Sequence, residues 1–226
     1  LIGILASCIS SAAVNTFTAV SGSDWNTVVN WSAGHVPADG EDVVVNGNVL
    51  LTNATAELAS YTLNAGKTHT FNGWGTVISA QVVNVYGTLT HTNNLATTTN
   101  EVGQWVPNAR VWVVCSNLTV ATAGKIDTSA MGYKGGTNAA GTIIRGCGPG
   151  GGGNAANGHG VGGSHGGFGG EWLASSCGPT NDAYAAPSNP GSGAGPGGDV
   201  GKYGGAGGGV VAINASGAVT ANGSIL

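Results

Sequence analysis

Glycine constrains this chain more than any other feature, because it supplies 43 of the 226 residues. That share is more than twice the ordinary value of about 7%. Glycine costs about 1 kcal/mol relative to alanine in a helix interior, and the Glu and Lys residues that usually cover helix surfaces are scarce here. A helix bundle is therefore excluded, and the composition favours strands or other extended structure.

The glycine excess lies in one block, since 26 of the glycines fall between residues 145 and 209. Glycine recurs at every third position in two runs, 160–169 and 195–207. Three residues per turn is the period of polyproline II, and a glycine stripe lets such helices pack backbone to backbone. A flexible linker is the alternative. An ordered block is favoured by its apolar, aromatic and cysteine residues, which are Cys147, Phe168, Trp172, Leu173, Cys177, Tyr184 and Tyr203.

Short alternating runs rich in Val and Thr fill residues 14–144, and Asn-Gly and Ala-Gly pairs separate them, which is typical of strands and tight turns. A weak repeat is centred on Gly47, Gly87, Gly124 and Gly217. Its spacing of 28 to 40 residues, with the glycine block discounted, indicates stacked coils. The expected fold class is all-β: a parallel β-solenoid or β-helix-like strand region with an inserted glycine-rich polyproline II or loop block.

Four segments follow from this division. They are a signal-peptide-like remnant at 1–13, the solenoid-like region at 14–144, the glycine-rich block at 145–209 and a returning strand segment at 210–226 that looks truncated. In the first segment, Cys8 resembles the lipidated cysteine of a lipoprotein box, and Ala13 ends an ordinary small-residue cleavage site. A buried N-terminal strand is the third possibility.

Charge excludes several classes of function. The chain has six Lys and Arg, ten Asp and Glu, and a net charge of -4. No basic patch can neutralise a run of phosphates, so we expect no nucleic-acid partner. The apolar N-terminal stretch is shorter than the roughly 20 residues that a bilayer requires, so we expect no membrane span. The expected partners are further copies of the chain, other surface or matrix proteins, and glycans.

Two groups of motifs resemble known families. Large secreted bacterial β-helix surface proteins, of the autotransporter and adhesin type, open on motifs similar to Asp24-Trp25-Asn26, Asn30-Trp31-Ser32, Val36-Pro37 and Glu41-Asp42-Val43-Val44-Val45. The stretches 118–127, 132–136, 163–170 and 205–209 resemble the glycine-rich segment of extracellular proteins from bacteria, protists and plants. The period-three block also resembles polyproline II bundles such as that of snow flea antifreeze protein. These resemblances imply a secreted or cell-surface protein with a structural role.

The cysteines raise two possibilities. In an exported protein, a disulfide between Cys147 and Cys177 would contribute about 3 kcal/mol or somewhat more. The same two residues with His159 and His165 make up a Cys2His2 set for zinc. Six residues of polyproline II would place the two histidines roughly 19 Å apart, which disfavours one shared ion. We expect the disulfide and a buried free thiol at Cys115.

The acidic residues give little support to catalysis. Asp39, Glu41 and Asp42 could bind calcium with loop carbonyls, although a solvated turn at a strand end is the simpler interpretation. A polysaccharide-acting site would have to be built from Glu101, Arg110, Lys125 and Asp127. We therefore expect no enzyme and no cofactor.

The six tryptophans could stack on sugar rings, but we expect most of them to fill the core. Thr88, Thr90 and Thr92 alternate along one strand and could order water or ice. The predicted function is an adhesin, sheath or filament component without catalysis. A carbohydrate-acting β-helix enzyme and an ice- or glycan-binding module are the alternatives.

Overall fold

The chain folds into an all-β structure, which we describe from a computed structural model. The residues described are 14–140, 142–153, 159–171, 177–183 and 187–226. Their helical content is one short 3-10 turn, η1 (Val28–Asn30). No helix in these ranges is long and apolar enough to cross a membrane. The predicted all-β class is confirmed, and so is the parallel pairing of most strands.

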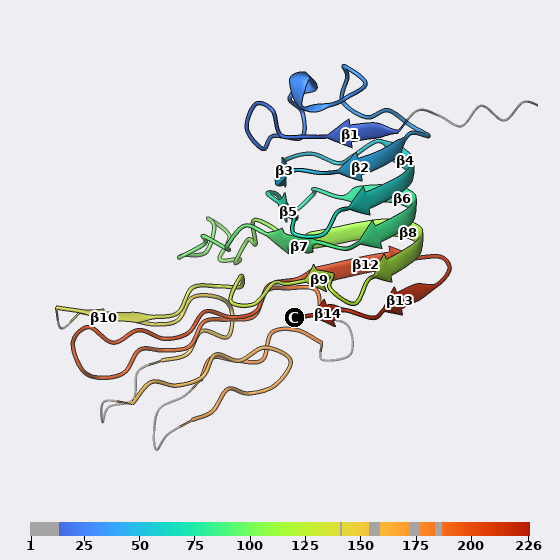
Figure 1. Cartoon of the computed structure of the whole chain (residues 1–226). Helices are drawn as coiled ribbons and strands as arrows, with labels where there is room; N and C mark the ends of the chain where they lie inside the picture. Colours follow the sequence, from blue (N-terminus) through green and yellow to red (C-terminus); the bar gives the residue numbers. More distant parts are fainter. Residues whose placement is uncertain (1–13, 141, 154–158, 172–176, 184–186) are drawn as a thin grey trace, which may run out of the picture.

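Two parallel sheets make up the body of the molecule (Figure 1). The larger, sheet A, has the order β1 (Asn15–Phe17), β2 (Asp42–Val45), β4 (Glu57–Leu63), β6 (Ile78–Val85), β8 (Val111–Val120) and β12 (Val211–Ala215), and β13 (Val219–Ala221) also pairs with β8. Sheet B has the order β14 (Ser224–Ile225), β9 (Lys125–Ile126), β7 (Thr88–His91), β5 (Thr68–Phe71) and β3 (Val49–Leu51).

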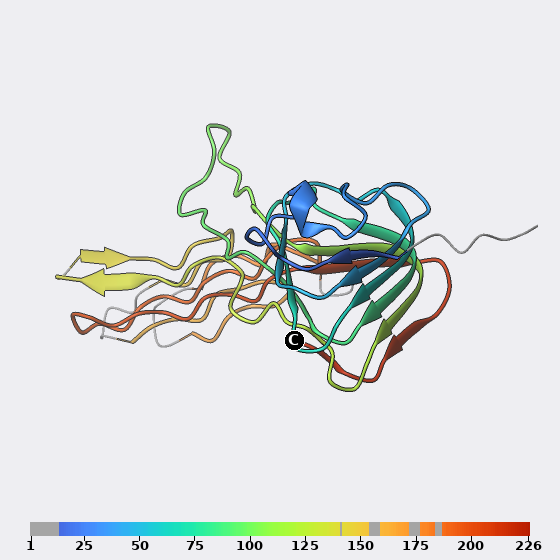
Figure 2. The same cartoon turned by 45° about the horizontal axis from the view of Figure 1, so that its top comes forward.

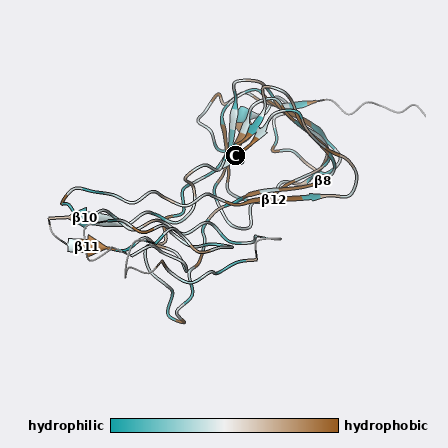
Figure 3. Cartoon of the chain, turned by 90° about the horizontal axis from the view of Figure 1, so that it is seen from below, coloured by the Kyte–Doolittle hydropathy of each residue, from teal (hydrophilic) through white to brown (hydrophobic). Residues whose placement is uncertain are grey.

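The chain alternates between the sheets, so that each strand of sheet B follows one of sheet A. We call such a pair of strands, with its connections, a coil. Asp42 is in register with Ser60, Ser60 with Val82, and Val82 with Asn117. The coils from β2 to β8 therefore take between 18 and 35 residues, because the connections differ in length, whereas the coil from β8 to β13 contains the projecting segments and takes 101. Seen along the stack (Figure 3), the coils outline a ring.

The core lies inside this ring because alternate residues of each strand point inward. Val43, Tyr61, Val83 and Leu118 are in register across four strands and are all buried. Above the first coils, Trp25 and Trp31 pack edge to face, with ring centroids 4.6 Å apart. Both indoles are buried and close this end of the core. The expectation that tryptophans fill the core is confirmed for these two.

Glycines stack at one corner, where the chain turns from sheet A to sheet B. A Cβ on Gly87 would lie 2.2 Å from the Lys67 carbonyl oxygen, and one on Gly124 would lie 2.1 Å from that of Val85. The equivalent residue of the last coil is Gly223, whose Cβ would meet the oxygen of Gly124 at 2.2 Å. The repeat assigned from sequence used Gly217 instead of Gly223. That assignment is wrong, because Gly217 lies between β12 and β13 and not at this corner.

A layer of extended segments projects sideways from the lower coils (Figures 1 and 2). Its backbone hydrogen bonds recur every third residue. The Tyr133 and Gly136 N–H groups donate to Gly191 and Ala194, while the Gly207 and Gly204 N–H groups donate back to Tyr133 and Gly136. We call residues 132–140, 142–153, 159–171, 177–183 and 187–209 the glycine layer. It includes the antiparallel hairpin of β10 (Thr137–Ala139) and β11 (Thr142–Ile144).

At several glycines of this layer, close backbone approaches leave no space for a side chain. A Cβ on Gly204 would lie 2.0 Å from the Ala194 oxygen, and one on Gly195 would lie 1.8 Å from the Gly153 oxygen. Gly132 and Gly136 are already hydrogen bonded to the layer, although they precede the block boundary at residue 145 expected from composition. Glycine is therefore required here by close packing of neighbouring segments.

The layer rejoins the coils at a seam formed by His91 and Val210. The Val210 N–H donates to His91 Nε2 at 3.2 Å, and Nδ1 lies 2.8 Å from the Thr92 oxygen. The ring is buried at the end of β7, and burial lowers its pKa. Neutral imidazole therefore donates from Nδ1 and accepts at Nε2.

Candidate functional site

A concave surface lies on the outer face of sheet A. It is an open groove of about 700 Å³ that crosses β4, β6, β8 and β12. The strands bend there: Leu58 pairs with Ala80 and Ser60 with Val82, while Ala59 and Gln81 drop out of the register. We call this surface the sheet A groove. Its floor is rigid because the parallel ladder pairs these strands in one continuous sheet.

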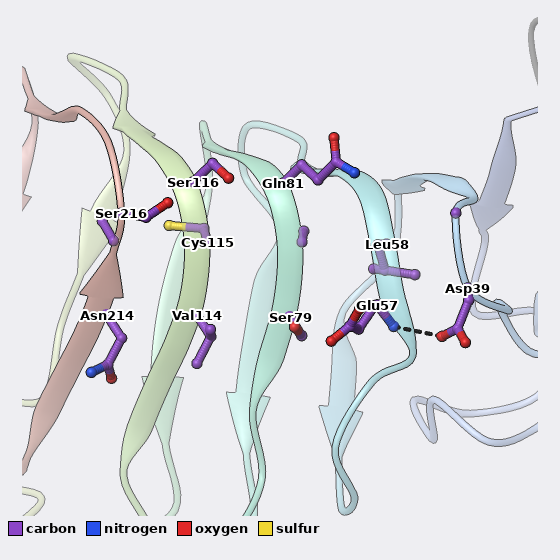
Figure 4. Close-up of a pocket in the computed structure, with 13 residues that line it drawn as sticks. Asp39, Glu57, Leu58, Ser79, Gln81, Val114, Cys115, Ser116, Asn214 and Ser216 are labelled. Atoms are coloured by element: carbon purple, nitrogen blue, oxygen red, sulfur yellow. Dashed lines mark hydrogen bonds between the residues drawn. The ribbon is translucent and has the colours of Figure 1, made fainter.

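Side chains line the groove in rows that follow the register (Figure 4). One row consists of Glu57, Ser79, Val114 and Asn214, which are opposite one another on successive strands. At the bend, a second row consists of Gln81, Ser116 and Ser216. Hydroxyl, amide and carboxylate groups therefore recur at the strand spacing of about 4.8 Å.

The acidic end of the groove is formed by Asp39 and Glu57. The Glu57 N–H donates to Asp39 Oδ1 at 2.8 Å, and the Gly40 N–H donates to the Glu57 oxygen at 2.7 Å. These bonds fix the loop to the first residue of β4. In the described residues the Glu57 carboxylate has no hydrogen-bond or ion-pair partner. Among the described residues that line the groove there is no Lys or Arg, so its two carboxylates leave it negatively charged.

An aromatic ledge adjoins the groove. The Arg110 guanidinium carbon lies 4.7 Å from the Trp74 ring centroid and 4.1 Å from that of Trp112. Arg110 Nε also donates to the Trp74 oxygen at 2.9 Å. Trp112 Nε1 donates to Asn214 Oδ1 at 3.0 Å, and this bond joins the ledge to the groove. Trp112 lies on β8 and Trp74 in the connection between β5 and β6, and neither belongs to the buried core.

The expected disulfide is not present. Cys147 and Cys177 are both free thiols in the described residues. Cys147 Sγ lies 3.9 Å from the Thr97 oxygen, whereas Cys177 Sγ donates to Glu171 Oε1 at 3.0 Å. The prediction failed because the segments are fixed by backbone bonds that give each sulfur its own neighbour. Cys115 is a buried free thiol, as expected, and burial raises its pKa.

The candidate metal ligands are separated. His165 Nε2 lies 3.7 Å from Asp182 Oδ2. In the segment considered for calcium, Asp39 accepts from Glu57, Glu41 accepts from Ala38 and Asn15, and Asp42 accepts from the Ser60 hydroxyl. In the part of the chain that is described, including His159, no three His, Cys, Asp or Glu residues are grouped to hold an ion.

The residues considered for polysaccharide chemistry are not one cluster either. Lys125 and Asp127 lie at sheet B, and the Ser129 N–H that donates to Asp127 lowers the pKa of its carboxyl. Arg110 lies on the sheet A side, and Glu101 is exposed in the loop before β8.

The remaining expectations concern tryptophan, the threonine row and the N-terminal processing sites. Trp105 packs edge-on against Tyr133, with centroids 5.3 Å apart. Thr88 and Thr90 are in register with Thr68 and Thr70 on the outer face of sheet B. Cys8, Ala13 and Trp172 lie outside the described residues, so the processing sites stay predictions.

Sequence reasoning missed the groove as a site. Its polar residues are the outward half of ordinary strand alternation, so Ser79 and Asn214 look like any solvent-facing strand residue. The available signal was the pair Ser116 and Ser216, which mark the bend. Comparisons with protein families, with curated proteins and with solved structures gave no match to this chain.

Proposed function

We propose that this chain is an extracellular structural or surface protein, such as an adhesin, sheath or filament component, and that it is not catalytic. Its strand-bearing part would be a parallel β-solenoid, and its glycine layer a polyproline II bundle. The alternation between sheets A and B supports the solenoid. The hydrogen bonds at every third residue support the bundle, because that spacing is the period of polyproline II.

The observation that carries this proposal is the apolar surface of the projecting layer. Phe168 is 76% exposed, Tyr203 72% and Ile144 55%. Tyr203 and Ile144 both lie opposite Thr137, so their side chains share one face. Exposed apolar groups on a rigid, charge-poor layer are typical of surfaces that contact other proteins.

Two inward-facing residues of the coil formed by β13 and β14 are not covered by another strand within the described residues. Val219 is in register with the buried Leu118, and Ile225 with the buried Ile126. Nevertheless Val219 and Ile225 are nearly half exposed. Contact with another surface that carries unpaired strands would bury these inward-facing groups and pair the outer edge of β12 to β14.

Immunogold electron microscopy of the cells that produce the protein tests this role. Antibodies raised against the purified chain should label the cell exterior or the material between cells. Label confined to the cell interior would refute the proposal. Negative-stain images of the purified chain should show end-to-end or lateral assemblies, and strictly single particles would refute the filament version.

Carbohydrate binding is a second candidate, because the sheet A groove is open and polar. A carbohydrate-acting enzyme would use the same groove with Asp39 and Glu57. Chromatography of pectin-, alginate- and glucan-type polymers after incubation separates these alternatives. We expect no shortened products, and their appearance would contradict the non-catalytic role.

A further inference from the structure

We propose that the sheet A groove binds a linear polysaccharide that carries no acidic groups, with the sugar chain lying across β4, β6, β8 and β12. This inference deepens the proposed surface role and rests on it for the source of the polymer. All residues that line the sheet A groove belong to the described part of the chain.

The shape of the groove fits a polymer. It crosses four strands at a spacing of about 4.8 Å, which gives a run of roughly 15 Å. The groove is an open channel on the outer surface, so a chain longer than the site can pass through it. A small apolar ligand would instead require an enclosed, mostly apolar cavity.

The chemistry of the walls fits sugar hydroxyls. Glu57 and Asp39 supply acceptors at one end, while Ser79, Ser116 and Asn214 supply groups that both donate and accept. These groups stand on a paired sheet, so little conformational entropy is lost when a ligand binds. The Trp112 ledge, joined through Asn214, adds an apolar edge for the faces of sugar rings.

Charge selects among polysaccharides. Asp39 and Glu57 have no cation beside them in the groove, and the Arg110 guanidinium is held on the ledge between two indoles. Carboxylate or sulfate groups on a ligand would therefore meet like charge. Neutral sugars avoid this repulsion, and the ammonium groups of amino sugars would be attracted to the two carboxylates.

Peptide binding by strand addition does not fit this surface. β4, β6 and β8 are each paired on both sides within sheet A, so the groove floor offers no free backbone edge. A peptide would have to bind through side chains alone, without the main-chain bonds that give such complexes their affinity.

A glycan array probed with the full chain tests the ligand class, and titration of the best oligosaccharide by calorimetry gives its affinity. We expect neutral or amino-sugar oligomers to bind and uronic-acid or sulfated oligomers not to bind. Binding to no glycan, or to acidic glycans only, would overturn the proposal.

Two variants locate the site. Glu57→Lys and Ser79→Tyr should each weaken the affinity about tenfold or more, which is about 1.4 kcal/mol. Glu101→Lys makes the same charge change on an exposed loop and should leave the affinity unchanged. Far-UV circular dichroism and the urea midpoint show that each variant is folded. Unchanged binding by folded Glu57→Lys and Ser79→Tyr would overturn the assignment of the groove.

The result distinguishes this inference from the proposed function. Binding without an exterior location would leave the groove assignment standing and refute the surface role. Exterior labelling without glycan binding would support the surface role and overturn the groove assignment. Release of shortened products from a bound glycan would support the groove and contradict the non-catalytic role.

Discussion

Adjacent glycines in the layer have opposite surroundings, which gives a controlled comparison at the scale of single residues. A Cβ on Gly204 would meet the Ala194 oxygen at 2.0 Å, whereas one on Gly205 would meet nothing within 4 Å. We predict that Gly204→Ala lowers the free energy of unfolding by about 1–3 kcal/mol or more, as overpacking does. Gly205→Ala should be neutral or stabilising by about 0.4–1 kcal/mol, because it restricts the unfolded chain.

Urea unfolding of both variants measures this difference. If the glycine segment were a flexible linker, the two substitutions would behave alike. Equal midpoints for Gly204→Ala and Gly205→Ala would therefore contradict the close packing described for the layer.

A second residue-scale prediction concerns pH. His69 is fully buried, its Nδ1 lies 2.7 Å from the Tyr61 hydroxyl, and burial lowers its pKa from 6.5 to about 3. The native state then binds fewer protons than the unfolded state below pH 6.5, so acid destabilises the fold. The loss grows as the pH falls towards 3 and reaches about 4–5 kcal/mol.

Removing the buried pair tests this effect. The double variant Tyr61→Phe/His69→Phe leaves no titrating group and no unpartnered hydroxyl at this position. The free energy of unfolding, measured by urea at several pH values, should fall less between pH 6.5 and 3 than in the unmodified protein. Parallel pH profiles for the two proteins would show that His69 titrates normally.

At the scale of elements, the aromatic cap should matter for stability. Trp31 contacts Phe17 and Trp25 edge to face, and its Nε1 donates to the Trp25 oxygen at 2.7 Å. We expect Trp31→Ala to cost about 3–5 kcal/mol, the usual range for a buried tryptophan. Trp112→Ala, on the outer face, should cost much less. Thermal unfolding compares the two, and equal losses would contradict a capping role for Trp31.

The seam between the layer and the coils supplies another element-scale prediction. His91→Leu removes the acceptor of the Val210 N–H and should cost about 1–3 kcal/mol for an unpaired buried donor. Amide exchange at Val210 should accelerate, while exchange at Val83, between β4 and β8, should change little. Equal acceleration at both amides would instead indicate global destabilisation without a local seam.

Elements also show which parts of the fold are accessible from sequence. Short alternating runs of apolar and polar residues predicted strands within 14–144, and β2, β6 and β8 lie there, because inward and outward positions differ in hydrophobicity. The exact repeat was not accessible. The coils from β2 to β8 take 18 to 35 residues and have no fixed period, and the corner position between Gly47 and Gly87 is occupied by Lys67, not by a glycine.

At the scale of the whole molecule, the sheet A groove was also not predictable from the sequence. Composition predicted a charge-poor, all-β chain, and the period of three predicted that its glycines are ordered. The sheet A groove draws its polar groups from distant segments, with Asp39 and Glu57 at one end and Asn214 on β12 at the other. Their placement on one surface is set by coil register, which the residue pattern alone does not determine. The failed disulfide has a different cause, because backbone bonds within the glycine layer place Cys147 beside Thr97 and Cys177 beside Glu171.

Residue-resolved amide hydrogen exchange of the intact chain tests the central claim, that the glycine-rich segment is a packed layer attached to a stacked-strand body. The amides of Tyr133, Gly136, Ala194 and Gly204 donate to neighbouring segments and should exchange slowly, at rates comparable to that of Val83 in sheet A. Rapid exchange of all four, with protection confined to the strands of sheets A and B, would contradict the account.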